Sequence, residues 1–208
     1  MELNNPFLDD FRALMGLEDN SRFHEWMETS WIDREHLITR WKTGKTIGEL
    51  LKDDVAFRQD MDRHVQESRK REEWTKYYAW AIPTEDAIRH LVELSPILEV
   101  GAGGGYWAWL IGQMGGRSAC YDLGFRQVEK QWHPVEYGGA EIVRCFRKHT
   151  LFLCWPEYDT AFVFDCLRQY RGEFLVYVGE GCGGCTGDDN FHGLIEDEYD
   201  EVKDLNIP

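Results

Sequence analysis

The sequence predicts an α/β fold, a mainly parallel sheet with helices on both faces, preceded by a helical N-terminal extension. Two observations predict it. Short apolar runs alternate with helical patterns over the second half of the chain, and this alternation is typical of parallel sheets, whose strands are joined by crossover helices. The first of these strands also runs directly into a glycine-rich loop that opens a helix, as in doubly wound folds.

Two regions differ in their patterning. Residues 1–75 are expected to form the helical extension and residues 76–208 the α/β core. In the first region apolar side chains recur with a helical period, as at Phe7 and Phe11. The almost entirely charged run of residues 67–73 is interpreted as a solvated helix face or a hinge.

Cap and turn signals separate the elements of the core. Thr84 begins a helix whose first turn is acidic, which suits the positive end of the helix dipole, and Ser95-Pro96 ends that helix. A last helix is expected to be capped by Thr186 and Asp188. The elements expected after the first helix are strand Ile97–Val100, helix Tyr106–Met114, strand Arg117–Asp122, strand Thr150–Cys154, helix Thr160–Tyr170, strand Glu173–Val178, helix Phe191–Tyr199 and strand Glu201–Ile207. Residues 124–149 have no clear pattern.

Charge and hydropathy limit the classes of partner. The formal net charge is -15, without a compensating basic block, and phosphate backbones are bound chiefly by clustered Lys and Arg. Nucleic acid is therefore a poor default partner. No apolar run approaches the roughly 20 residues of a membrane helix, and the N-terminus lacks a basic-then-apolar signal pattern. We expect a cytoplasmic protein without membrane association, acting on a small molecule or a protein, and homo-oligomerisation stays open.

The strongest chemical signal is the glycine loop that follows the first core strand. Glycines stand at positions 101, 103 and 105, where they permit left-handed backbone and close approach of a ligand to the bare chain. A dinucleotide fingerprint would need glycine at the sixth position of the motif, where Tyr106 stands. The pattern therefore favours another ligand over NAD, although a loop that only turns a strand into a helix stays an alternative.

Two carboxylates flank this loop. Glu99 lies two residues before the first glycine, and Asp122 ends the next strand, about 20 residues beyond the loop. An acid beside the loop suits a cationic amino-acid group better than a diphosphate. An acid at the second strand end is placed to accept both hydroxyls of a ribose.

Together these residues resemble motifs I and II of class I S-adenosylmethionine (SAM)-dependent methyltransferases, which have a Rossmann-like sheet. The resemblance implies that Gly101, Gly103 and Gly105 lie under the amino-acid part of SAM. It also implies that Glu99 organises the loop and the ammonium side, and that Asp122 holds the ribose. The remaining cofactor contacts would come from Ala102, Tyr106, Trp107 and Leu123, and from Tyr78. An aromatic face such as that of Tyr78 attracts the sulfonium cation, but core packing explains this residue equally well.

The chain is also similar to a subgroup of such methyltransferases in four short segments. These are Ala81-Ile82-Pro83, Gly105-Tyr106-Trp107-Ala108, Trp155-Pro156 and residues 183–188. The resemblance implies a fold and a cofactor, but no substrate. Class I domains generally end with an antiparallel hairpin of two strands, and only thirty residues follow Val178. The final edge strand is therefore expected to be absent.

The resemblance places the methyl acceptor past the fourth strand, at Trp155 and Pro156. Methyl transfer needs a nucleophile held in line with the sulfonium methyl, and a base when that nucleophile carries a proton. Candidate bases are His133, Glu157 and Tyr158. Enzymes that methylate amino groups of nucleic acids have a polar residue where Trp155 stands, which agrees with the acidic charge in disfavouring such a substrate.

A cysteine pair at Cys182 and Cys185, followed by His192, suggests zinc or redox chemistry. A structural zinc site needs four ligands, and a redox pair is expected in a thioredoxin-like context; neither is evident. We therefore favour a glycine-rich loop and expect no metal. The functional hypotheses are a SAM-dependent methyltransferase acting on a small molecule or a protein side chain, a non-catalytic SAM-binding or partner-binding protein and, less favoured, an NAD-linked oxidoreductase.

Overall fold

In the computed structural model the described residues are 3–15, 70, 73–124 and 128–207. The chain divides into two compact units, one formed by residues 1–7 with 75–208 and the other by residues 8–74. The first seven residues thus group with the α/β core, although the sequence placed them in the extension.

Helix α1 (Pro6–Met15) is described, whereas the helices expected over residues 16–69 lie outside the described residues. Within the second unit, Phe11 packs edge-on against Trp74, with ring centroids 6.4 Å apart.

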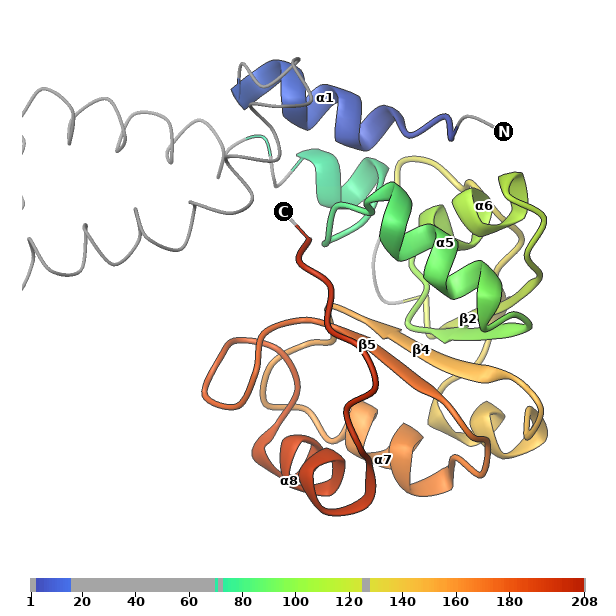
Figure 1. Ribbon diagram of the computed structural model, residues 1–208, viewed down its shortest axis with the longest axis vertical. Coiled ribbons are helices and arrows are strands. Elements are labelled where there is room, and N and C mark those ends of the chain that lie inside the picture. The colour runs from blue at the N-terminus through green and yellow to red at the C-terminus, as the bar shows by residue number, and fades with distance from the viewer. Residues whose placement is uncertain (1–2, 16–69, 71–72, 125–127, 208) are drawn as a thin grey trace, which may run out of the picture. The chain divides into compact units, whose positions relative to one another are not determined.

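The first unit is built on a five-stranded sheet with the order β3-β2-β1-β4-β5 (Figure 1). Every neighbouring pair of strands is parallel, which confirms the predicted α/β, Rossmann-like arrangement. The strands are β1 (Ile97–Val100), β2 (Ser118–Asp122), β3 (Glu136–Tyr137), β4 (Thr150–Cys154) and β5 (Leu175–Val178). All four residues of β1 and the first four of β4 are buried, as expected for central strands of a parallel sheet covered on both faces.

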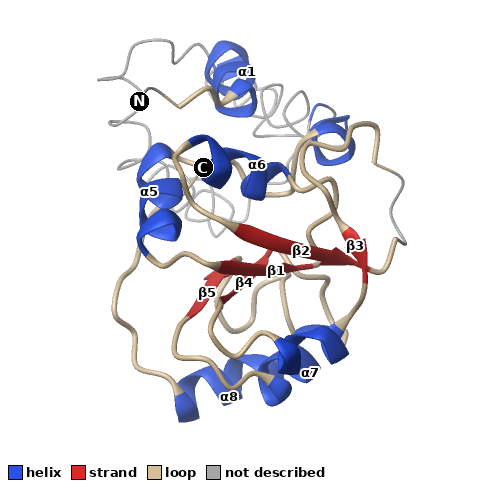
Figure 2. Cartoon of the chain, turned by 90° about the vertical axis from the view of Figure 1, so that its right-hand side faces the viewer, coloured by secondary structure: helices blue, strands red, loops and turns tan. Residues whose placement is uncertain are grey.

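Helices cover both faces of this sheet (Figure 2). Helices α5 (Glu85–Glu93) and α6 (Tyr106–Gln113) pack together on one face. Helices α7 (Phe162–Gln169) and α8 (Asp189–Glu198) lie on the other, with the 3-10 helix η1 (Ala140–Cys145) against α7. The caps predicted at Thr84 and Asp188 are confirmed: the Thr84 hydroxyl accepts from the N–H of Ala87, and the Asp188 carboxylate accepts from the N–H of Phe191. Thr186, expected to cap the last helix together with Asp188, does not do so, because its hydroxyl accepts from the N–H of Glu180. Each cap satisfies a backbone donor that the helix itself leaves unpaired.

Two expectations about strands differ from the structure. The sheet has a third strand, β3, in the region left unassigned, and its two residues are too short for a period of two to be visible. The strand expected over Glu201–Ile207 is wrong, because this segment carries no strand pairing. Val202 lies among charged residues of this segment and is 81% exposed. Little apolar surface is therefore buried to hold the segment against the sheet. In the described part of the chain, no helix has the length and apolar character needed to cross a membrane.

Candidate functional site

The glycine loop has the backbone conformation that its sequence predicts. Gly101, Gly103 and Gly105 have φ angles of +80°, +53° and +72°, in the left-handed region that favours glycine. The N–H groups of Gly101 and Ala102 both donate to the carbonyl of Tyr121, at 2.8 and 3.1 Å. The loop that follows β1 is thereby tied to the end of β2.

Asp122 and the glycine loop meet at the carboxyl ends of β1 and β2. Asp122 Oδ2 accepts from the N–H of Gly103 at 2.9 Å, and Oδ1 accepts from the N–H of Gly124 at 2.8 Å. A Cβ added at Gly103 would meet no atom within 4 Å. The loop therefore presents bare backbone to open space immediately beside a carboxylate that accepts one hydrogen bond on each oxygen.

Glu99 lies beneath the loop and not on its surface. Its side chain is 2% exposed, and its carboxyl accepts from the N–H of Ala108 and from Cys120 Sγ at 3.7 Å. Burial raises the pKa of Glu99 to about 8, because the apolar interior disfavours the charged form. Glu99 therefore links β1, β2 and the first turn of α6, and it is mostly neutral near pH 7.

A segment that the sequence left unassigned packs along the second half of the loop. We call residues 129–135 the strap. The N–H of Trp132 donates to the carbonyl of Gly104 at 2.8 Å, and its indole Nε1 donates to the carbonyl of Tyr77 at 2.7 Å. A Cβ added at Gly104 would lie 2.5 Å from the carbonyl oxygen of Lys130. The strap thus requires glycine at position 104.

His133 belongs to the strap and adjoins the loop. A Cβ added at Gly105 would lie 2.8 Å from the His133 Cβ, so Gly105 faces the strap. His133 Nδ1 lies 2.9 Å from the carbonyl oxygen of Pro134. A carbonyl only accepts hydrogen bonds, so this contact places a proton on Nδ1, and in the neutral tautomer of the ring Nε2 is then the nitrogen with a lone pair.

The other predicted acceptor and base residues follow β4. Trp155 has a φ of +48°, and its N–H donates to the carbonyl of Val178 at 2.6 Å. Pro156 is buried, whereas Glu157 and Tyr158 are exposed, Tyr158 by 61%. The three candidate bases thus lie on two different elements, with His133 in the strap and the other two after β4.

Tyr78 and Tyr106 belong to an aromatic cluster with the N-terminal segment. Tyr78 is stacked with Phe7 and with Trp132, at centroid distances of 5.0 and 5.6 Å. The Tyr106 hydroxyl donates to Asn5 Oδ1 at 2.8 Å and accepts from the N–H of Phe7 at 3.1 Å. Core packing therefore accounts for the contacts of both rings. The sequence signal for this cluster is the density of Trp and Tyr at residues 74–80, 106–109 and 132.

The remaining predicted cofactor residues are placed as follows. Ala102 is buried at 9% exposure in the loop itself. Leu123 follows Asp122, and its side chain lies 3.1 Å from where a Cβ on Gly139 would be. Trp107 lies in the core against Phe152, with centroids 5.2 Å apart, and its buried indole N–H has no acceptor among the described residues.

The cysteine pair lies in a surface loop. Cys182 and Cys185 are exposed thiols, whereas the buried ring of His192 contacts the carbonyl of Thr186 through Nε2 at 2.9 Å. The Thr186 hydroxyl also accepts from the N–H of Glu180 at 2.7 Å. Among the described residues, no three His, Cys, Asp or Glu side chains are arranged to hold a metal ion.

Comparisons with known proteins leave the family open. No family model matches the chain, and neither the curated proteins nor the solved structures include one that is significantly similar to it.

Proposed function

We propose that this chain binds SAM at the carboxyl ends of β1 and β2 and transfers its methyl group to a small molecule or a protein side chain. The observation that carries the proposal is that Gly103 lies beside Asp122. The left-handed backbone of Gly103 faces open space, and the Asp122 carboxylate accepts a hydrogen bond from its N–H. Open α/β sheets bind ligands where the strand order reverses. In the order β3-β2-β1-β4-β5, that reversal lies beside β1, whose carboxyl end carries this loop.

The residues present fit such a cofactor. An ionised carboxylate offers about four acceptor positions, and Asp122 uses one on each oxygen for Gly103 and Gly124. It can therefore accept two ribose hydroxyls without releasing the loop. Only residues 101–103 of the glycine loop are assigned to the ligand, because the strap covers Gly104 and Gly105.

Glu99 has a supporting role in this proposal. Its carboxyl is neutral near pH 7 because burial raises its pKa to about 8, so it does not offer a full negative charge to an ammonium group. Its hydrogen bonds with Ala108 and Cys120 hold the start of α6 against β1 and β2. Glu99 is thus a positioning residue for the loop.

The cofactor, when bound, supplies a methyl group on a sulfonium cation. The chain has to hold the acceptor nearby and take up its proton. Among the candidate bases, His133 is favoured, since it adjoins the loop and its neutral tautomer, with the proton on Nδ1, has a lone pair on Nε2. Trp155 and Pro156 follow β4, across the strand reversal from the glycine loop, and are assigned to the acceptor side.

The second candidate function is SAM binding without catalysis. It is favoured by the exposure of Glu157 and Tyr158, since bases that work on a bound acceptor are usually screened from bulk water. The two functions share a cofactor site and differ in turnover.

Isothermal titration calorimetry with SAM, S-adenosylhomocysteine and NAD tests the cofactor class. We expect the two adenosyl compounds to bind and NAD to bind more weakly, and preferred binding of NAD would refute the proposal. Transfer of labelled methyl groups from SAM to fractionated metabolites and proteins then separates the two functions. Labelling that His133→Ala abolishes while SAM still binds supports the enzyme, and binding with no labelling in any fraction supports the non-catalytic protein.

A further inference from the structure

The two edges of the sheet differ in how they are protected. Strand β3 has only two residues, one of them Glu136, and short charged edges resist pairing with other chains. Strand β5 is Leu-Val-Tyr-Val, with no charged residue or proline. All four β5 residues are partly exposed, and Phe174, which precedes them, is 39% exposed. Strand β5 itself therefore lacks the short length and the charge that protect the β3 edge.

Part of the β5 backbone faces away from β4. The carbonyls of Phe174 and Val178 accept from N–H groups on the β4 side, at 3.0 and 2.6 Å. Residues in a parallel strand alternate between its two neighbours, so the backbone groups of Leu175 and Tyr177 face away from β4. In the described part of the chain, no strand pairs with β5 on that side.

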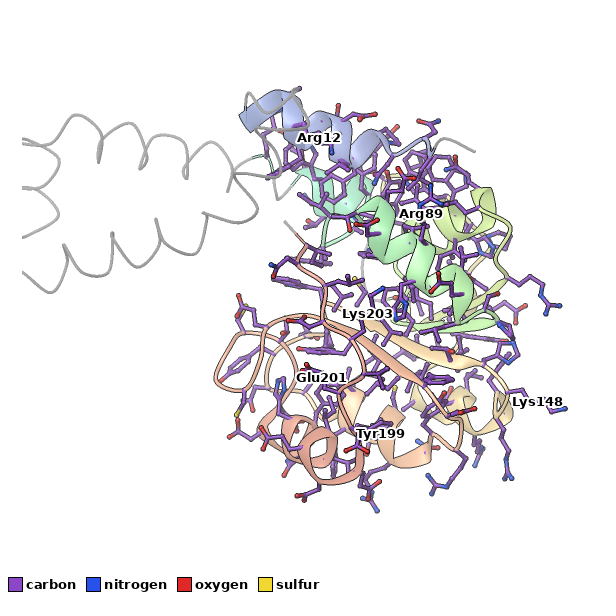
Figure 3. All side chains as sticks on the ribbon, viewed as in Figure 1. Arg12, Arg89, Lys148, Tyr199, Glu201 and Lys203 are labelled. Atoms are coloured by element: carbon purple, nitrogen blue, oxygen red, sulfur yellow. The ribbon has the colours of Figure 1, made fainter. Side chains whose placement is uncertain are left out.

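A groove of about 1720 Å³ runs along this edge. Its walls include β5, helix α5 and the C-terminal tail, which we define as residues 199–207. Figure 3 shows Tyr199, Glu201 and Lys203 along the tail as it passes β5. The volume exceeds the roughly 300–1,000 Å³ of small-molecule pockets. A groove of this size beside an open strand suits an extended peptide segment.

The charges at the groove indicate which peptide fits. Six lining residues are acidic and three are Lys or Arg. The acidic ones are exposed, and they are Glu173, Glu196, Glu198, Asp200, Glu201 and Asp204. A second copy of the chain would bring the same acidic rim and a net charge of -15 against this surface, and like charges placed opposite each other are repelled. Charge complementarity therefore favours a basic partner over self-association.

We propose that the β5 edge binds an extended segment of a partner protein in which Lys or Arg alternates with β-branched residues. The segment adds to the sheet as a strand beside β5, with main-chain hydrogen bonds to Leu175 and Tyr177 and its basic side chains near the acidic tail. Strand addition of this kind obtains affinity from the backbone and specificity from alternate side chains. The inference does not depend on SAM binding or on methyl transfer.

The test uses the full chain and a short acetylated peptide of alternating Lys and Val that carries a fluorophore. Two control peptides keep the length: one has N-methyl groups on alternate amides, and the other has Glu in place of Lys. Fluorescence anisotropy is expected to show binding of the Lys peptide and at least about tenfold weaker binding of both controls. Amide hydrogen exchange is expected to slow at Leu175 and Tyr177 when the Lys peptide is present.

Paired variants test the charges on the protein. Glu201→Gln combined with Asp204→Asn is expected to weaken peptide binding roughly three- to tenfold, whereas Glu129→Gln with Asp189→Asn, exposed acids outside the groove, leaves it unchanged. Equal binding of the N-methylated peptide, or no slowing of exchange at β5, would overturn the proposal. Slowing of exchange at β5 that grows with protein concentration alone would overturn it in favour of a second copy.

Discussion

Strands β1 and β5 each have four mostly apolar residues, Ile-Leu-Glu-Val and Leu-Val-Tyr-Val, yet the fold buries them very differently. Every residue of β1 is buried, even the carboxyl of Glu99, while every residue of β5 is partly exposed. Among the residues that the structure describes, strand β1 pairs with β2 and β4, and β5 pairs with β4 alone. The number of paired neighbours, and not composition, accounts for the difference in burial between the two strands.

The largest expected effect comes from the acid buried in β1. Glutamate has an ordinary pKa of 4.5, and burial raises that of Glu99 to about 8. Between these values the native chain holds a proton that the unfolded chain has lost, so the free energy of unfolding falls as pH rises through this window and levels off above it. The shift corresponds to a loss on the order of 5 kcal/mol.

Glu99→Gln removes this titration. Urea unfolding at pH values from about 5 to 9 is expected to show the variant gaining stability over the native chain as pH rises, by several kcal/mol at the upper end. Glu196→Gln, at an exposed position in α8, serves as the control and is expected to give a difference that hardly varies with pH. A Glu99→Gln difference that is equally flat would show that the Glu99 carboxyl is not desolvated.

The strand comparison is tested next with two leucines that face each other in register. Leu151 of β4 pairs with Leu175 of β5; the first is 0% exposed and the second is partly exposed. Leu151→Ala is expected to lower the free energy of unfolding by about 3–4 kcal/mol, and Leu175→Ala by about 1–2 kcal/mol, because less surface is buried there. Chemical denaturation measures both, and equal losses would mean that the β5 edge is as well packed as the centre.

A smaller effect is expected where the strap crosses the loop. Gly104→Ala places a Cβ 2.5 Å from a backbone carbonyl of the strap, and such overpacking lowers stability by about 1–3 kcal/mol. Gly112→Ala in α6, where a Cβ meets nothing within 4 Å, is the matched control and is expected to stabilise by about 0.5–1 kcal/mol. A neutral Gly104→Ala in thermal unfolding would mean that the strap does not hold this position.

The sequence predicted the elements that carry strong local signals. The strand Ile97–Val100, the left-handed glycines after it and the caps at Thr84 and Asp188 all agree with the structure. Each depends on residues within a few positions of one another, on a turn that needs glycine or on a side chain that caps the next turn.

Features decided by distant contacts were not predictable in the same way. The strap is held by hydrogen bonds to Gly104 and Tyr77, which lie far from Trp132 along the chain. The Tyr106 hydroxyl bonds Asn5, a partner that no local pattern reveals, and its contact with the cofactor stays a prediction. The tail at Glu201–Ile207 alternates enough to suggest a strand, yet strand formation requires a paired neighbour.

The central claim, that a SAM ribose binds Asp122 beside Gly103, is tested most directly by calorimetry on Asp122→Asn. Asparagine keeps the shape of the side chain and one acceptor for the N–H of Gly103 but removes the charge and two acceptor positions. SAM is expected to bind the native chain and Glu196→Gln, an exposed position in α8, alike, and Asp122→Asn roughly ten- to a hundredfold more weakly, with all three folded by circular dichroism. SAM affinity that is unchanged in Asp122→Asn, or absent in the native chain, would contradict the account.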